Sequence, residues 1–107
     1  MAFQTGSNIL DFLVLAILNN GDTYGYILTR NAKLLMDISD STLYPVLRRL
    51  QKDGALTTYD QAFDGRNRRY YSITEKGKEL LEGYRVEWET YKNQMDLILS
   101  GGDLGNE

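Results

Sequence analysis

The sequence predicts a mainly α-helical protein with one small β-hairpin and a long C-terminal helix. Three features lead to this prediction: four segments carry apolar residues at helical spacing, a β-favouring run follows the third segment, and an Asp-Gly turn pair precedes that run. The 107 residues suffice for one domain with an appended helix. We expect the domain in residues 1–74 and the C-terminal helix with its tail in residues 75–107.

The first helix is predicted to begin at Ser7, a favourable N-cap, and to end at about Asn19, before the turn pair Asn20-Gly21. Its apolar residues lie almost all round the helix: Ile9, Leu10, Phe12, Leu13, Val14, Ile17 and Leu18. A helix of this kind has to be covered on more than one side. We expect both its own domain and a partner chain to cover it.

A second helix is predicted from its cap at Thr23 to about Met36, and residues 37–40 form the turn after it. Four apolar side chains of this helix are expected to face inward: Ile27, Leu28, Leu34 and Leu35. A third helix follows this short turn, so the pair forms a helix-turn-helix unit.

The third helix is predicted to start after the cap Ser39, where Ile38 and Leu43 have the spacing of a hydrophobic staple, and to end at Gly54. Its core side is formed by Leu43, Val46, Leu47 and Leu50. The opposite side carries Ser41, Tyr44, Pro45, Arg48 and Lys52. Arg49 lies nearer to the domain side, and we interpret it as a surface cation.

Two strands are predicted after this helix, Thr57–Asp60 and Arg69–Thr74, with Asp64-Gly65 as the turn between them. Tyr71 and Ile73 share one face of the second strand. The resulting order of helix, helix, helix, hairpin and helix is that of a winged helix-turn-helix.

Thr74 is predicted to cap a final helix that runs to about Ser100 and is stopped by Gly101-Gly102. An apolar seam with alternating spacings of three and four runs along this helix: Leu81, Tyr84, Trp88, Tyr91, Met95 and Ile98. So small a domain cannot cover both this seam and the apolar first helix. We therefore predict a homodimer held by the final helix, with residues 102–107 frayed.

The composition excludes several functions. The chain has no cysteine and no histidine, which removes disulfides, thiolate metal sites and the commonest general base. It has no Gly-rich phosphate loop, metal-ligand spacing or nucleophile–base pair, so we expect no enzymatic activity, metal or cofactor. The longest apolar stretch, Ile9–Leu18, is too short to span a bilayer. We expect a cytoplasmic protein.

Positive charge is concentrated in one part of the chain. The net charge is −3, but residues 41–74 carry six cations against three anions, which gives +3. Three arginines stand beside the predicted turn: Arg66, Arg68 and Arg69. A cationic hairpin behind a helix that fits the major groove indicates contact with DNA. A solvated turn is the alternative, and Arg69 has the further alternative of pairing with Asp60 or Asp64.

The exposed side of the third helix supplies the other candidate DNA contacts. Arg48 can offer a bidentate fork to a guanine, and Lys52 lies one turn further on. Hydroxyl groups and backbone N–H groups near the helix start commonly hold a phosphate, and this start carries Ser41, Thr42 and Tyr44. Tyr44 is equally well interpreted as a half-buried aromatic residue.

An aromatic stripe lies within the seam of the final helix: Tyr84, Trp88 and Tyr91. Packing in the dimer is the first interpretation of this stripe. Three bulky rings pack less tightly than Leu or Ile, however, and can leave a slot for a flat, drug-like ligand. Both interpretations stay open on the sequence alone.

Two motifs, STLYPVLRRLQKDG and GRNRRYYSITEKGKELL, resemble the PadR family of bacterial transcriptional regulators, and YGYILTR resembles the start of that family's second helix. The resemblance covers about Asn8 to Trp88 and implies a DNA-binding winged helix-turn-helix. The single C-terminal helix resembles a subgroup that dimerises through that helix and the first one. Some members of the subgroup resemble multidrug sensors that bind flat apolar compounds. Ile27 and Gln51 depart from the family pattern, which has acidic residues there.

These observations predict a homodimeric transcriptional regulator, acting as a repressor, that binds a palindromic operator in double-stranded DNA and is released by a small planar apolar effector. The alternative is a winged-helix protein–protein interaction module whose basic hairpin docks an acidic protein. Sequence-selective duplex binding with a steep salt dependence separates the two, because a protein-docking module predicts neither.

Overall fold

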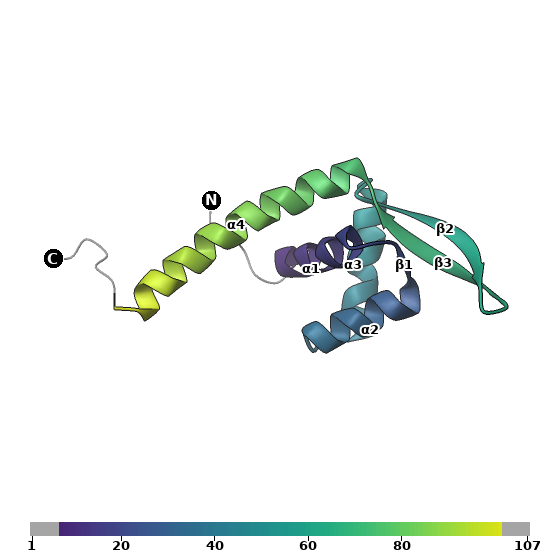
Figure 1. Ribbon diagram of the computed structural model, residues 1–107, viewed down its shortest axis with the longest axis horizontal. Helices are drawn as coiled ribbons and strands as arrows, with labels where there is room; N and C mark the ends of the chain where they lie inside the picture. Colours follow the sequence, from purple (N-terminus) through teal and green to yellow (C-terminus); the bar gives the residue numbers. More distant parts are fainter. Residues whose placement is uncertain (1–6, 102–107) are drawn as a thin grey trace.

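A computed structural model describes residues 7–101 of the chain. Within these residues the elements are α1 (Ser7–Asn19), β1 (Thr23–Tyr24), α2 (Gly25–Leu35), α3 (Asp40–Lys52), β2 (Leu56–Phe63), β3 (Arg66–Ile73) and α4 (Glu75–Leu99) (Figure 1). The predicted winged helix-turn-helix with a long C-terminal helix is confirmed, and β1 is an addition to it. No helix among the described residues is long and apolar enough to cross a membrane.

The core lies between α1, α2, α3 and the start of the hairpin. Its buried apolar residues are Val14, Leu15, Leu18, Leu28, Ala32, Leu43, Val46, Leu47, Leu50, Ala55 and Leu56. The four residues that helical spacing placed on the inner side of the third helix are all among them, so that prediction is confirmed. Full burial of one such Leu or Val side chain contributes roughly 1.5–3 kcal/mol, which fixes α3 with its other side outward.

The second helix differs from its prediction. Thr23 is not its cap, because Thr23 pairs with Tyr71 in the sheet and the helix begins at Gly25. Leu34 and Leu35 do not face inward, since they are 77% and 66% exposed. At about 100° per residue, Leu34 lies on the opposite side of the helix from the buried Ala32, and Leu35 is the last residue of the helix.

The wing is a three-stranded antiparallel sheet in the order β1-β3-β2. Phe63 pairs with Arg66 across the turn Asp64-Gly65, whose residues have φ angles of 54° and 76°. The predicted turn is thus confirmed, and this pair of positive angles is typical of a two-residue hairpin turn. Both long strands reach further toward the turn than predicted, so Arg66 and Arg68 join Arg69 within β3 rather than lying in a loop.

The last helix starts at the predicted cap. The Thr74 hydroxyl accepts a hydrogen bond from the Gly77 backbone N–H at 3.0 Å. Gly77 is buried where a Cβ would collide with the Ala55 carbonyl oxygen, so the helix can enter the domain closely only with glycine here. α4 passes along α1 and then extends away from the domain (Figure 1). The helix ends at Leu99, and Gly101 has a φ of 78°; the predicted tail of residues 102–107 lies outside the described residues.

Candidate nucleic-acid interface

The outer side of α3 is exposed as predicted. Five candidate DNA contacts lie there, all with exposed side chains: Ser41, Thr42, Tyr44, Arg48 and Lys52. The helix start is held by its cap, since the Ser39 hydroxyl accepts the Thr42 N–H at 3.3 Å and lies 3.0 Å and 3.1 Å from the Ser41 and Thr42 hydroxyls. These hydroxyls therefore belong to an ordered cluster at the positive end of the helix, which is a favourable place for a phosphate.

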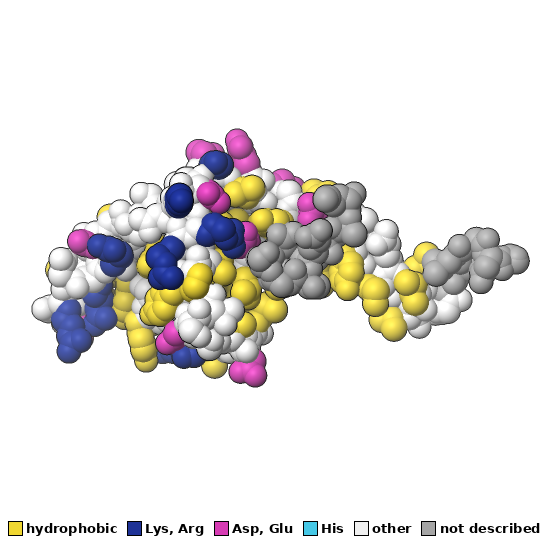
Figure 2. Space-filling model, turned by 180° about the vertical axis from the view of Figure 1, so that it is seen from behind, with side chains coloured by type: hydrophobic (Ala, Val, Ile, Leu, Met, Phe, Trp, Pro, Cys, Tyr) yellow, Lys and Arg dark blue, Asp and Glu magenta, His cyan; other side chains and the backbone are white. Residues whose placement is uncertain are grey.

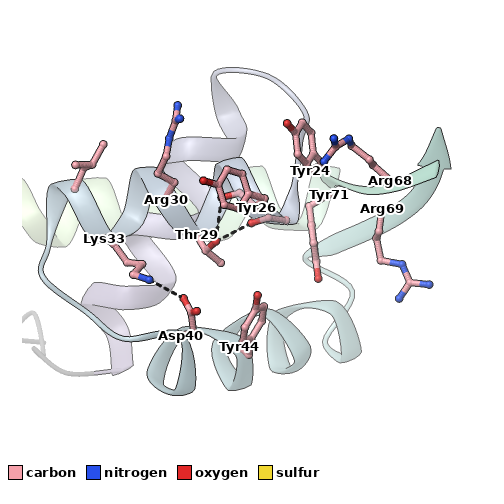
Figure 3. A pocket seen from close by; sticks show the side chains of 12 residues that line it. Tyr24, Tyr26, Thr29, Arg30, Lys33, Asp40, Tyr44, Arg68, Arg69 and Tyr71 are labelled. Carbon is pink, nitrogen blue, oxygen red and sulfur yellow. Dashed lines mark hydrogen bonds and ion pairs between the residues drawn. The ribbon is translucent and has the colours of Figure 1, made fainter. Parts of the chain in front are cut away.

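A groove of about 640 Å³ separates this side of α3 from α2 and β3 (Figure 3). Its lining includes four tyrosines and four cations: Tyr24, Tyr26, Tyr44, Tyr71, Arg30, Lys33, Arg68 and Arg69. Tyr44 from α3 and Tyr71 from β3 point into the space between the two elements (Figure 3). Tyr44 is 42% exposed, so it is neither a core residue nor fully solvated.

The α2 side of this groove was missed by the sequence interpretation. Arg30 and Tyr26 of α2 are exposed, and Lys33 forms an ion pair of 3.3 Å with Asp40 at the start of α3. Both partners of that pair are about half exposed, so it contributes little to stability. The signal available in the sequence was the pair Arg30 and Lys33 itself, because a spacing of three puts both cations on one side of a helix.

The three arginines of the wing do not share one face. Side chains alternate along a strand, so Arg66 and Arg68 lie on the outer face of the sheet and Arg69 on the face toward α3. Arg69 forms an exposed ion pair of 3.6 Å with Asp60, which confirms the alternative that Arg69 pairs with an aspartate of the hairpin. Arg68 stacks over the rings of Tyr24 and Phe63, at 4.5 Å and 5.7 Å from their centroids.

The outer face of the sheet carries a continuous row of rings. Tyr59 and Tyr70 stack with centroids 5.4 Å apart, Tyr70 meets Tyr24 edge-on at 5.6 Å, and Tyr24 lies 5.9 Å from Phe63. The Tyr59 hydroxyl donates to Asp22 at 2.8 Å, and this hydrogen bond is the main cause that raises the pKa of Tyr59. Such cross-strand aromatic pairs stiffen an otherwise isolated hairpin.

On the face seen in Figure 2, basic side chains gather at one end of the molecule, where apolar side chains are exposed as well. Figure 2 shows Lys and Arg side chains over the hairpin and helix-turn-helix end, whereas hydrophobic side chains lie along the visible far part of α4. That far part includes the seam residues Met95 and Ile98, which are 37% and 52% exposed. The charge distribution therefore agrees with the sequence-based concentration of cations in residues 41–74.

Arg49 is an exposed cation, as expected, but it is also paired with a buried carboxylate. Its guanidinium donates two hydrogen bonds to the carboxylate of Asp11 on α1, Nη2 to Oδ1 at 2.6 Å and Nη1 to Oδ2 at 3.0 Å. The Tyr84 hydroxyl on α4 donates to the same Oδ2 at 3.2 Å. The hydrogen bonds that Arg49 donates to Asp11 raise the pKa of Arg49. Burial, followed by the charge of Asp11, raises the pKa of Tyr84.

The predicted seam divides into two parts. Leu81 and Tyr84 pack against the chain's own core, and the Tyr84 ring lies 6.2 Å from that of Phe12 on α1. Trp88 and Tyr91 lie further along, partly buried, with ring centroids 6.2 Å apart. A shallow apolar depression of about 180 Å³ lies between α1 and the end of α2, lined by Ile9, Phe12, Leu13, Ala16 and Met36. Tyr84 is thus turned toward α1.

Comparison with known proteins agrees with this geometry. The family described as "Transcriptional regulator PadR-like family" matches residues 14–83. The chain is similar to a Streptococcus mutans UA159 protein of known structure, with 38% identity and a TM-score of 0.87 over 99% of this chain and 100% of the other. It is also similar to a PadR-like transcriptional regulator of Bacillus cereus, with 30% identity and a TM-score of 0.79 over 85% and 91% of the two chains. Over 44 residues, 41% of each chain, it is 46% identical to the transcriptional regulator Rv3488 of Mycobacterium tuberculosis.

Proposed function

Because the chain belongs to the PadR-like family of transcriptional regulators, we propose that it is a homodimeric repressor of transcription that binds a palindromic operator. In this proposal α3 enters the major groove and the hairpin contacts the backbone or the minor groove. α4 joins two copies and sets the distance between the half-sites. A planar apolar effector that binds beside Trp88 releases the DNA.

The observation that carries the proposal is the two-sided character of α3. Its inner side is anchored in the core, while Tyr44, Arg48 and Lys52 face solvent beside the cation-lined groove. A single α-helix fits the major groove, where side chains can read base edges. Cations on α2 and on the hairpin flank α3 and are placed to contact phosphates, which fix the position of a reading helix on the duplex.

The homodimer is supported by apolar surface that one chain leaves uncovered. Leu99 is 78% exposed and Ile98 52% exposed at the far end of α4, and an apolar depression between α1 and the end of α2 is open to solvent. Exposed apolar surface in a row along an extended helix is typical of an interface between protein chains. A second copy covers α1 and α4 together when the two copies are related by a two-fold axis.

The effector is supported by the ring pair of Trp88 and Tyr91. These rings lie on one side of α4, 6.2 Å apart at 35°, next to the surface that the second copy is proposed to cover. Two copies bring four such rings together, and flat apolar molecules gain stacking energy between rings. An effector bound there changes how the two copies are placed and so how the two α3 helices fit the half-sites.

The decisive experiment is selection of duplexes from a random library with the purified full chain. We expect the enriched duplexes to share a two-fold symmetric motif and to bind typically 10³-fold or more tightly than a random duplex. The logarithm of the binding constant should fall steeply with the logarithm of the salt concentration. Absence of enrichment and of salt dependence would contradict DNA recognition and favour the protein-docking alternative.

The direction of regulation needs a separate test. The selected operator is placed between a promoter and a reporter gene, and the chain is expressed from a second, inducible promoter. Repression predicts that reporter output falls when the chain is induced, and that scrambling one half-site restores it. A rise of output on induction would contradict the repressor role while leaving operator binding intact.

A further inference from the structure

The Asp11 carboxylate joins three helices at one point. It is 4% exposed on α1 and accepts hydrogen bonds from Arg49 on α3 and from Tyr84 on α4. These partners are 38 and 73 residues away in the chain. α1 contacts both α3 and α4, so the carboxylate lies in the layer between the helix that faces DNA and the helix that faces the second copy (Figure 1).

The geometry holds Arg49 in one place. A carboxylate and a guanidinium that share two parallel hydrogen bonds are fixed in distance and in orientation, unlike a single contact between flexible charges. A buried carboxylate also cannot release its partners without a large desolvation cost. Arg49 directly follows Arg48, the residue proposed to read a base. Fixing Arg49 on the inner flank of α3 therefore fixes the rotation of α3 that presents Arg48.

Tyr84 adds α4 to the same carboxylate oxygen. Its hydroxyl and the Arg49 Nη1 atom both donate to Oδ2, at 3.2 Å and 3.0 Å. A shift of α4 that lengthens the Tyr84 bond changes the position that this oxygen prefers, and Arg49 has to follow because Asp11 is its partner at both oxygens. A displacement of α4 is thus transmitted to α3 through the hydrogen bonds that Tyr84 and Arg49 donate to this oxygen of Asp11.

We infer that Asp11 is the positioning residue of α3 and that Tyr84 makes this position depend on α4, so that the arrangement of the two copies sets how accurately α3 reads DNA. The inference rests on the proposed function, because it requires α3 to read an operator. It goes beyond that function by naming the link between the dimer helix and the reading helix.

The test compares Tyr84→Phe and Arg49→Lys with the wild-type full chain. Tyr84→Phe removes only the hydroxyl and keeps the ring on Phe12, and Arg49→Lys keeps the charge but loses the two-pronged geometry. Arg85→Lys is the matched control, because Arg85 also donates two hydrogen bonds to one carboxylate, from Nε and Nη2 to Glu82 at 3.2 Å and 2.8 Å, but on the exposed side of α4. Each variant is titrated by fluorescence anisotropy with the selected operator, with a random duplex, and with operators whose half-sites are moved apart or together by one base pair.

We expect Tyr84→Phe to lower the ratio of operator to random affinity roughly 3- to 10-fold, in the range of couplings carried by side-chain networks. Arg49→Lys should lower it at least as much. Tyr84→Phe should also narrow the difference between correctly and incorrectly spaced operators, because α4 no longer constrains α3. Arg85→Lys should match the wild type in both measurements.

The inference is overturned if both variants keep the wild-type affinity ratio and spacing preference within about twofold, whatever their melting temperatures, because the network is then only a structural anchor. If Tyr84→Phe does not fold by circular dichroism, Arg49→Lys tests the same link from α3. Failure of the proposed function looks different, since the wild-type chain then prefers no duplex over random DNA.

Discussion

The guanidinium of Arg68 lies over the ring of Tyr24, with its central carbon 4.5 Å from the ring centroid. Its Nε also donates to the Phe63 carbonyl oxygen at 3.4 Å. These contacts join the two-residue strand β1 to the hairpin and hold Arg68 along the sheet, whereas Arg66 beside the turn is exposed. A guanidinium held on an aromatic face loses less conformational freedom when it binds phosphate, and the stacking itself contributes roughly 0.5–1 kcal/mol at an exposed site.

The double variant Arg66→Ala with Arg68→Ala is expected to weaken binding of operator and random duplex alike. Phosphate contacts carry no sequence information, so both affinities should fall together, and the salt slope should become less steep by roughly one unit for each lost contact. Anisotropy titrations at four salt concentrations measure this, with Arg85→Ala as the control for loss of a cation elsewhere. An unchanged slope would show that the wing does not contact phosphates.

Arg48→Ala is expected to act differently, because a bidentate fork to a guanine is worth roughly 1–3 kcal/mol of discrimination. The operator affinity should fall by about 5- to 150-fold, and the random-duplex affinity by much less. Lys52→Ala serves as the comparison from the same side of α3 and should reduce both affinities by similar factors. Equal losses for Arg48→Ala on the two duplexes would make Arg48 a phosphate contact.

Much of the fold could be predicted because it is encoded locally. The caps Ser39 and Thr74 and the turn Asp64-Gly65 depend on neighbours within a few residues, and each was found where the sequence placed it. Helical spacing likewise identified the buried side of α3. β1 could not be predicted this way, since its two residues form a strand only by pairing with Tyr70 and Tyr71 much later in the chain.

The buried network could have been suspected but not located. Asp11 interrupts the most apolar helix of the chain, and a charged residue there implies a partner, because a buried charge is costly when unpaired. Which cation pairs with Asp11 depends on how α1 packs against α3. The partner is Arg49, 38 positions away in the chain. The α2 side of the groove was missed for the same reason, since packing decides which side of α2 faces α3.

Assembly can be tested with charges placed on the exposed part of the seam. Met95→Glu together with Ile98→Glu should give a folded monomer, because both side chains are exposed in the single chain and lie beyond its core. Operator affinity should fall at least 100-fold, since one copy reaches only one half-site. Sedimentation velocity measures whether the variant is a monomer, and circular dichroism measures whether it is folded. Thr90→Glu with Asn93→Glu adds the same charge outside the seam and should leave the dimer intact; a dimeric seam variant would contradict the proposed interface.

Tyr84 should make stability fall at alkaline pH. Burial first, then the charge and hydrogen bond of Asp11, raise its pKa above the ordinary value of 10.0, although Arg49 acts in the opposite direction. The folded chain therefore keeps the phenol proton in a window above about pH 10 where the unfolded chain has lost it. The stabilisation is complete below that window and is lost as pH rises through the folded pKa.

Urea unfolding across this pH range checks whether the free energy of unfolding falls as the pH rises. The free energy of unfolding of the wild type should decline more steeply with pH than that of Tyr84→Phe, which has no phenol at this position to ionise. Lysines and the other tyrosines titrate in both proteins and cancel in the difference. Parallel curves for the two proteins would show that the Tyr84 phenol ionises alike in the folded and unfolded chains.

Trp88 is the single tryptophan of the chain, so its fluorescence emission reports on this site alone. If a planar, preferably cationic compound stacks between the Trp88 rings of two copies, it gains about 1–2 kcal/mol beyond the burial of its area. Titration with planar dyes should then quench the emission saturably and release operator DNA over the same concentration range. Tyr91→Leu should weaken dye binding several-fold while keeping the dimer, whereas Tyr59→Phe on the distant wing should not. A panel of such compounds that leaves the emission unchanged in a folded, DNA-binding dimer would mean that Trp88 serves packing.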